Sequence, residues 1–245
     1  MSEYIEQDSK EPKYYSVKRH LLEYIEQLRP GSAVPTERAL AEELDTSRVT
    51  VRRALGELVA EGRLVRRQGS GTYVADDKIT WPLNIASFTE QAIANGLTPS
   101  SELLGIERVR ASREIAASLQ IEVGTDVHQL DRLRLANGRP TAVEVSYMPA
   151  PRFPYLARKI KDGGSLHAVI RDEYGVELFT GEETINTALA SPQHAKLLDA
   201  EVGSPMLVVS RLSRDRLGVP VELGTSWFRG DRITLTAVLN AEREH

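Results

Sequence analysis

The segment from residue 34 to residue 74 combines two short helical patterns with a basic, glycine-containing hairpin. Thr36 precedes apolar residues at helical spacing, so we expect it to be the N-cap of a first short helix. Residues 45–46 form the expected turn, and Ser47 caps a second helix whose apolar positions recur every three or four residues. Two extended arms then flank Arg66-Arg67-Gln68-Gly69-Ser70-Gly71. This order of elements predicts a winged helix-turn-helix.

The solvent side of the second helix carries arginines that suit the major groove of DNA. One guanidinium can donate to both acceptors of a guanine, and we expect Arg48 and Arg52 to contact bases. At the hairpin tip, glycine lets the backbone enter the narrow minor groove while flanking side chains meet phosphates. The expected DNA-contacting residues are Thr36, Arg38, Ser47, Arg48, Thr50, Arg52, Arg53, Arg67, Gln68, Gly69, Ser70, Gly71 and Thr72.

The alternative is an ordinary solvated helix, since arginines are common on the wet side of soluble domains. Each motif alone is weak, but their succession favours DNA binding. The positive charge is local, because residues 46–73 hold six arginines against two glutamates while the whole chain carries a net charge of −4. We therefore expect sequence-independent DNA binding to be modest.

Residues 14–74 resemble the DNA-binding domain of the GntR superfamily of bacterial repressors. In that family the arginine of a Pro-Ser-Glu-Arg motif, the Ser-Arg pair of the recognition helix and the wing glycine touch the operator. The resemblance implies these roles for Arg38, Ser47, Arg48 and Gly69. Thr36 replaces the common serine of the motif and keeps the capping hydroxyl.

The length of 245 residues requires a second domain, because a winged helix leaves about 165 residues unassigned. We expect a disordered arm at 1–12, a DNA-binding domain at 13–75, a linker at 76–82 and an effector-binding and dimerisation domain at 83–242. The chain has no cysteine, no apolar run of membrane-span or signal-peptide length, and no metal-ligand or nucleotide-binding pattern. We expect a cytoplasmic protein with no metal, cofactor, catalytic residue or membrane partner.

Extended segments dominate the second domain, and two of them flank the turn signal Asn137-Gly138. A two-residue loop and a three-residue loop would set different pairing registers. We favour the three-residue loop, 137–139, which sets Leu133 opposite Val143 and Leu135 opposite Thr141, because it groups apolar residues on one face.

This register places Arg132 opposite Glu144, with Arg134 on the same face. A lone surface ion pair would contribute little. However, Ser87 and Ser165 each precede a helical pattern, and helix N-termini hold phosphate well when arginines close the other side. A later hairpin, with Arg211 and Glu222, partly echoes this one. The sequence therefore predicts an anion pocket, whereas Glu182 and Glu183 are expected to be solvated and Trp81 to be a packing residue.

Residues 79–240 resemble the UTRA ligand-binding domain of the HutC branch of GntR regulators, a chorismate-lyase-like fold. The segments that carry the resemblance are Ser-Phe-Thr-Glu-Gln at 87–91, Arg-Leu-Arg at 132–134, Gly-Ser-Leu at 164–166 and Val-Glu at 221–222. The implied fold is α+β, a winged helix-turn-helix followed by a mainly antiparallel sheet flanked by helices. Within the branch, the chain is most similar to the amino-sugar regulators of the NagR and DasR type, whose ligands are phosphorylated glucosamines.

The resemblance also implies ligand contacts. The implied phosphate contacts are Ser87, Phe88, Thr89, Arg132, Arg134 and Ser165, and the implied sugar contacts are Glu144 and Glu222. His167 stands where these relatives usually have tyrosine, and Phe228 replaces another tyrosine and lacks its hydroxyl. A ligand contact and a structural role both remain open for His167, and Phe228 would stack on a ligand.

We expect a homodimeric, ligand-responsive repressor that binds an inverted repeat of double-stranded DNA, because one winged helix makes too few contacts for tight specific binding. The expected effector, the small molecule that controls DNA binding, is an anionic sugar phosphate such as glucosamine 6-phosphate or N-acetylglucosamine 6-phosphate. Trehalose 6-phosphate, urocanate and a fatty acid are the alternative effectors. A chorismate-lyase-like enzyme is the other alternative, with Glu144, Glu222 or His167 as its acid or base.

Overall fold

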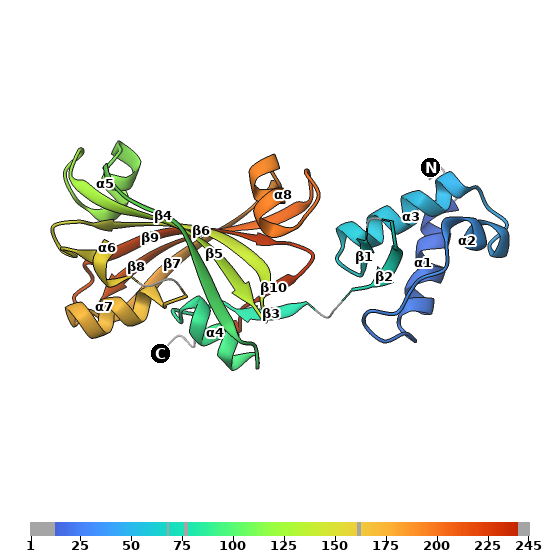
Figure 1. Ribbon diagram of the computed structural model, residues 1–245, viewed down its shortest axis with the longest axis horizontal. Coiled ribbons are helices and arrows are strands. Elements are labelled where there is room, and N and C mark those ends of the chain that lie inside the picture. The colour runs from blue at the N-terminus through green and yellow to red at the C-terminus, as the bar shows by residue number, and fades with distance from the viewer. Residues whose placement is uncertain (1–12, 68, 76–77, 161–162, 240–245) are drawn as a thin grey trace, which may run out of the picture. The chain divides into compact units, whose positions relative to one another are not determined.

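The chain divides into two units, residues 1–78 and residues 79–245, shown in the computed structural model of Figure 1. The structure describes residues 13–67, 69–75, 78–160 and 163–239. The expected disordered arm, Gln68 and residues 76–77 of the expected linker lie outside these residues, and Arg67 is described by its backbone alone. None of the described helices has the length and apolar character needed to cross a membrane.

The first unit is a winged helix-turn-helix, as expected. Its helices are α1 (Lys13–Ile25), α2 (Glu37–Glu43) and α3 (Arg48–Ala60), and its wing consists of β1 (Leu64–Arg67) and β2 (Gly71–Val74). Thr36 Oγ1 accepts a hydrogen bond from Ala39 N at 3.3 Å, and Ser47 Oγ accepts one from Thr50 N at 3.1 Å, so both expected N-caps are present. All five elements contribute to one apolar core, which includes Leu21, Leu40, Leu55, Leu64 and Val74.

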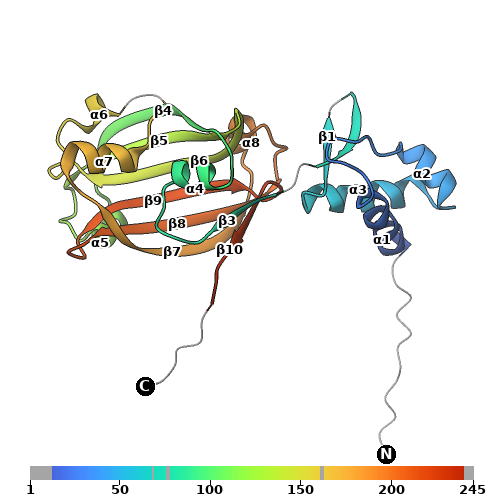
Figure 2. The same cartoon turned by 90° about the horizontal axis from the view of Figure 1, so that it is seen from below.

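The second unit is built on a six-stranded antiparallel sheet with the order β4-β5-β6-β9-β8-β7. The strands are β4 (Pro99–Arg110), β5 (Asp126–Ala136), β6 (Arg139–Pro149), β7 (Leu178–Leu189), β8 (Pro205–Asp215) and β9 (Pro220–Arg229). Figures 1 and 2 show α4 (Phe88–Ala94), α6 (Leu156–Lys159) and α7 (Leu166–Tyr174) on one face, and α5 (Arg113–Leu119) and α8 (Pro192–Leu198) on the other. The α+β prediction is confirmed.

Residues 79–82, which we expected in the linker, belong instead to the second unit. They form β3 (Ile79–Pro82), which pairs in parallel with β10 (Ile233–Thr236). Trp81 is 4% exposed, and its ring centroid lies 5.0 Å from that of Phe88 and 6.1 Å from that of Phe228. Burial of this indole fixes the segment to the sheet unit, so the second domain begins at residue 79 rather than at residue 83.

The β5–β6 hairpin corrects the expected loop length. Its turn has two residues, Asn137-Gly138, with φ values of 51° and 71°, the positive values that a type I′ turn requires. Leu135 therefore does not face Thr141, because a β-bulge leaves Thr141 as an extra residue. Beyond the bulge the expected register holds, with Arg132 opposite Glu144.

Candidate functional site

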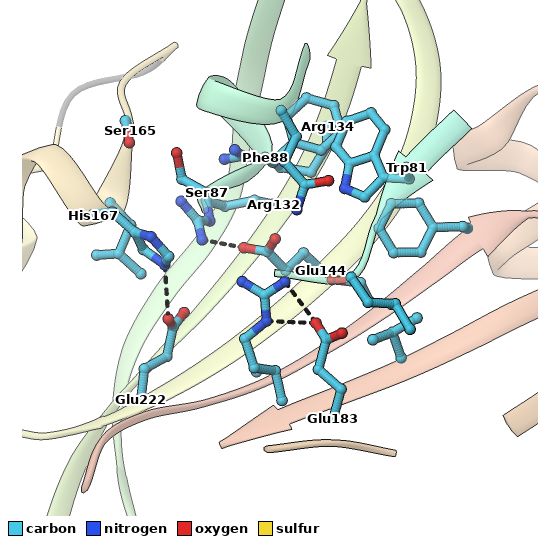
Figure 3. A pocket seen from close by; sticks show the side chains of 18 of the residues that line it. Trp81, Ser87, Phe88, Arg132, Arg134, Glu144, Ser165, His167, Glu183 and Glu222 are labelled. Carbon is cyan, nitrogen blue, oxygen red and sulfur yellow. Dashed lines mark hydrogen bonds and ion pairs between the residues drawn. The ribbon is translucent and has the colours of Figure 1, made fainter. Parts of the chain in front are cut away.

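A pocket lies on the face of the sheet that carries α4 and α7, beside the β3–β10 ribbon (Figure 3). Its empty space is about 710 Å³, part of which is open to solvent. Of the expected ligand contacts, the structure brings together Ser87, Phe88, Arg132, Arg134, Glu144, Ser165, His167, Glu222 and Phe228. Thr89, the second residue of α4, is half-buried and does not line the pocket.

Arg132 and Arg134 occupy successive inward positions of β5 and are 4% and 3% exposed. Arg132 Nη2 donates to Glu144 Oε1, and the Arg134 guanidinium lies 4.5 Å from the centroid of the Phe88 ring. Among the described residues, nothing accepts a hydrogen bond from Nε or Nη1 of either arginine. A buried donor without a partner costs about 1–3 kcal/mol. Acceptors supplied by a bound anion would relieve this cost.

Burial and neighbouring charges in the pocket shift the pKa values of Arg134, Glu144 and Glu222. Burial lowers the pKa of Arg134 to about 10, which still leaves its guanidinium charged near neutral pH. Burial alone would raise the pKa of Glu144, but Arg132 and Arg134 outweigh it and lower that pKa. Burial likewise opposes ionisation of Glu222, yet the hydrogen bond and charge of His167 bring its pKa down to about 2. The pocket thus combines ionised groups of both signs.

Glu222 predicts a specific acid sensitivity. Because the pKa of Glu222 falls from its ordinary 4.5 to about 2 on folding, its contribution to the free energy of unfolding is complete above pH 4.5 and is lost as the pH falls toward 2. We expect the Glu222→Gln variant to lose less free energy of unfolding than the wild type as the pH falls, by up to about 3 kcal/mol. Denaturant titrations from about pH 6 to about pH 2.5 measure it, with exposed Glu201→Gln as the control. An unchanged acid profile in Glu222→Gln would contradict the assignment.

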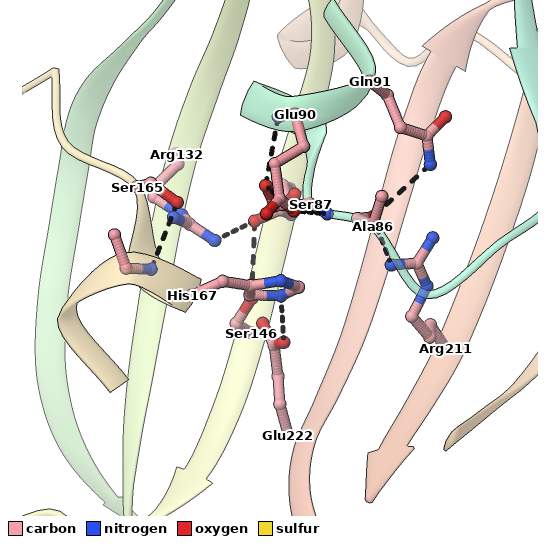
Figure 4. A network of polar contacts seen from close by, with 12 residues as sticks. Ala86, Ser87, Glu90, Gln91, Arg132, Ser146, Ser165, His167, Arg211 and Glu222 are labelled. Atoms are coloured by element: carbon pink, nitrogen blue, oxygen red, sulfur yellow. Dashed lines mark hydrogen bonds and ion pairs between the residues drawn. The ribbon is translucent and has the colours of Figure 1, made fainter. Parts of the chain in front are cut away.

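The two predicted serine contacts are helix caps (Figure 4). Ser87 Oγ accepts from Glu90 N at 3.1 Å, while Glu90 Oε2 accepts from Ser87 N at 2.8 Å, which completes a capping box at the start of α4. Ser165 Oγ accepts from Ala168 N at 3.3 Å at the start of α7. Both helices therefore begin at the pocket wall, where their N-terminal dipoles favour negative charge.

His167 is placed in the pocket rather than in an apolar core. Its Nε2 lies 3.2 Å from Glu222 Oε2, and the two side chains come from α7 and β9 (Figure 3). This contact, an ion pair when His167 is protonated, engages the Glu222 carboxylate that the resemblance assigns to the sugar. His167 consequently shapes that end of the pocket.

Arg211 and Glu183 form a part of the pocket wall that the sequence prediction missed. Arg211 Nε and Nη2 each lie 2.6 Å from Glu183 Oε1, and Arg211 Nη1 donates to Ala86 O at 3.1 Å (Figure 4). The expectation that Glu183 is solvated is wrong, because its side chain is only 14% exposed and lines the pocket. The similarity between the two hairpins already pointed to Arg211 in the sequence. Placing Glu183 beside Arg211 also required the pairing of β7 with β8, which the sequence did not reveal.

This contact predicts a difference between two neighbouring glutamates. Glu183→Gln removes the charge that neutralises a largely buried Arg211, so we expect the free energy of unfolding to fall by about 1–2 kcal/mol. Glu182→Gln is the matched control, since Glu182 is exposed on the same strand, and we expect a change below about 0.5 kcal/mol. Urea denaturation of both variants measures the difference. Equal effects of the two substitutions would contradict the placement of Glu183 in the pocket wall beside Arg211.

In the first unit, the expected DNA-contacting arginines differ in whether they already contact other side chains. Arg48 is exposed at the first turn of α3. Arg52 donates to both carboxylate oxygens of Glu37 at 2.7–3.0 Å, and the Arg53 guanidinium lies 3.8 Å from the centroid of the Tyr14 ring. Arg48 is therefore the better placed of our two expected base contacts, because Arg52 must leave a bidentate ion pair to bind a base.

The remaining expected DNA contacts lie at the helix caps and the wing. Thr50 Oγ1 is 2.8 Å from Ser47 Oγ, so both hydroxyls belong to the cap of α3. Arg38 is exposed and lies 3.7 Å from Glu42. Gly69 and Gly71 have φ values of 70° and 130°, which residues with a side chain rarely adopt. Ser70 and Thr72 flank Gly71 at this end of the wing.

Comparison with known proteins identifies both units. The family model "Bacterial regulatory proteins, gntR family" matches residues 13–74, and the UTRA domain model matches residues 94–234. The transcriptional repressor PhnF of Mycolicibacterium smegmatis is 37% identical over 94% of this chain and 93% of its own length. The repressor NagR of Bacillus subtilis is 32% identical over 94% and 96%. The crystal structure of PhnF from Mycobacterium smegmatis gives a TM-score of 0.67 at 38% identity, covering 92% of this chain and 100% of that one.

A DNA-binding winged helix joined to a UTRA domain defines a transcription regulator that responds to a small-molecule effector. The matched models and relatives are those of regulators, so the enzyme alternative is not supported. The chain belongs to the GntR family, in its HutC branch of transcriptional repressors.

Proposed function

We propose that this repressor is controlled by a phosphorylated sugar bound in the UTRA pocket. The observation that carries the proposal is the pair of buried arginines that line the pocket, Arg132 and Arg134, which have four nitrogens without a hydrogen-bond partner among the described residues. Guanidinium groups with spare donors bind the oxygens of a phosphate through charge-assisted hydrogen bonds. The N-termini of α4 and α7 also line the pocket, and their dipoles favour a bound anion.

Other residues that line the pocket support a sugar body. Glu144 and Glu222 supply ionised carboxylates that accept hydrogen bonds from hydroxyl groups, and Phe228 supplies a ring face. We propose glucosamine 6-phosphate or N-acetylglucosamine 6-phosphate as the effector, and the similarity to NagR supports an amino sugar. The alkyl chain of a fatty acid would have to bury these charged groups without hydrogen bonds, which is costly. Trehalose 6-phosphate and urocanate are less favoured effectors of the same site.

The DNA-bound form is proposed to be a homodimer on an inverted repeat. Two winged helices related by a two-fold axis match two half-sites, and each DNA-binding domain supplies its own Arg48 to the major groove. We propose that the effector favours a spacing of the DNA-binding domains that does not match consecutive half-sites. Operator binding and effector binding then weaken each other by the same factor. The proposed location is the cytoplasm, where the operator is accessible.

A thermal-shift screen tests the effector class. The full chain is heated with phosphorylated sugars, the matching unphosphorylated sugars, urocanate and a short fatty acid, all at one concentration. We expect amino-sugar phosphates to raise the melting temperature, because a ligand that binds only the folded state stabilises it, and the unphosphorylated sugars to have no effect. Stabilisation by urocanate or the fatty acid alone would refute the proposal that the effector is a sugar phosphate.

A further inference from the structure

Gln91 is a pocket residue to which neither the sequence nor the family resemblance gives a role. It lies on α4, one turn after Ser87, and lines the pocket. The residue is 2% exposed. Its side-chain carbonyl oxygen, Oε1, is buried, and no described group donates a hydrogen bond to it.

The orientation of the Gln91 amide is fixed by its neighbours. Its Nε2 donates to Asn84 Oδ1 at 3.2 Å and to Ala86 O at 3.4 Å (Figure 4). Asn84 Oδ1 in turn accepts from Ala86 N at 3.0 Å, and a backbone amide can only donate. Both partners of Gln91 are therefore acceptors. Turning the amide by 180° would place its carbonyl against two other oxygens, so the carbonyl must be the unpartnered group.

The segment that orients Gln91 is itself held in place. Ala86 O also accepts from Arg211 Nη1 at 3.1 Å, and Arg211 is paired with Glu183. On the same strand as Glu183, Gly181 has no side chain, and a Cβ there would lie 2.8 Å from Ile85 Cδ1. The 84–86 turn thus packs closely on β7 and β8. Such support keeps a polar group oriented before any ligand arrives.

We propose that Gln91 is a further effector-contacting residue, whose carbonyl accepts a hydrogen bond from a hydroxyl or amide N–H of the ligand. The proposal rests on the proposed function, because it takes the UTRA pocket as the effector site. It adds a requirement to that function. The ligand must carry a hydrogen-bond donor on its body as well as the anionic group that satisfies Arg132 and Arg134. A sugar phosphate meets both requirements, whereas a plain anion meets one.

The first test needs no ligand and uses Gln91→Met in the full chain. Methionine has a similar length but lacks both the carbonyl and the amide nitrogen. Removing an unsatisfied buried oxygen then offsets the loss of the two Nε2 hydrogen bonds, and we expect the melting temperature to change by less than about 4 °C. Gln193→Met is the matched control, because Gln193 is an exposed glutamine on α8. A fall of more than about 4 °C in Gln91→Met alone would mean that Gln91 is needed for the fold itself, and its role as an effector contact would be rejected.

The second test compares two probes by calorimetry, N-acetylglucosamine 6-phosphate and inorganic phosphate. We expect Gln91→Met to lose about tenfold in affinity for the phosphosugar, with the affinity for inorganic phosphate unchanged because the arginines are intact. Equal losses for both probes, or no loss for the phosphosugar, would overturn the role of Gln91. If the wild-type chain binds inorganic phosphate and no phosphorylated sugar, the proposed function fails, whereas a wild-type chain that binds the phosphosugar with an affinity that Gln91→Met leaves unchanged rejects the role of Gln91 alone.

Discussion

Arg134→Met is expected to lower effector affinity about 100-fold while leaving the free protein at least as stable as the wild type. The loss follows from removing donors to a charged acceptor, each worth about 1.5–3 kcal/mol. Stability is retained because Arg134 is buried and has unpartnered nitrogens among the described residues. Glu144 keeps its ion pair with Arg132, so the substitution removes a buried charge without leaving that carboxylate unpaired.

Calorimetry with N-acetylglucosamine 6-phosphate and urea denaturation measure the two halves of this result. Arg108→Met on β4 is the matched control, because Arg108 is exposed, and we expect it to change neither quantity. If Arg134→Met instead lost several kcal/mol of stability and bound the effector normally, Arg134 would be a structural residue, and the anion site would be wrongly assigned.

Arg48→Ala is expected to have the largest effect on DNA binding. Losing a bidentate contact to a base costs about 1–3 kcal/mol per half-site, and a dimer on an inverted repeat loses it twice. The variant should also accept other bases at the contacted position. Arg67→Ala should instead weaken binding to all sequences alike and reduce its salt dependence, as expected for a phosphate contact.

Fluorescence anisotropy measures both DNA variants on a site selected from random DNA, on that site with the contacted base changed, and on random DNA. Arg29→Ala is the control, because Arg29 is exposed and outside the expected DNA-contacting set. The assignment of Arg48 as a base contact would be rejected if Arg48→Ala lost equal affinity for the selected and the random DNA.

The sequence predicted the elements whose signals are local. Thr36 and Ser47 were recognised as caps because each bonds to an amide three residues away, and Asn137-Gly138 marks its turn through its own backbone preference. The predicted loop length was wrong. A bulge at Thr141 allows the turn to have two residues while Arg132 still pairs with Glu144, and no local sequence signal marks this bulge.

Long-range pairing explains the other errors. Residues 79–82 resemble a linker until β10, far along the chain, pairs with them and buries Trp81. The expected hairpin register grouped Arg132, Arg134 and Glu144, and the family resemblance assigned them to the ligand together with Glu222. The roles of Arg211 and Glu183 needed the strand order to be known, and that of Gln91 needed an account of every donor and acceptor around the 84–86 turn.

The central claim is that an anion held by Arg132 and Arg134 controls operator binding. Calorimetric titration of the full chain with N-acetylglucosamine 6-phosphate, with and without saturating operator DNA, tests it most directly. We predict weaker effector binding in the presence of the operator, by the same factor by which the effector weakens operator binding. Equal effector affinity with and without the operator would contradict the account.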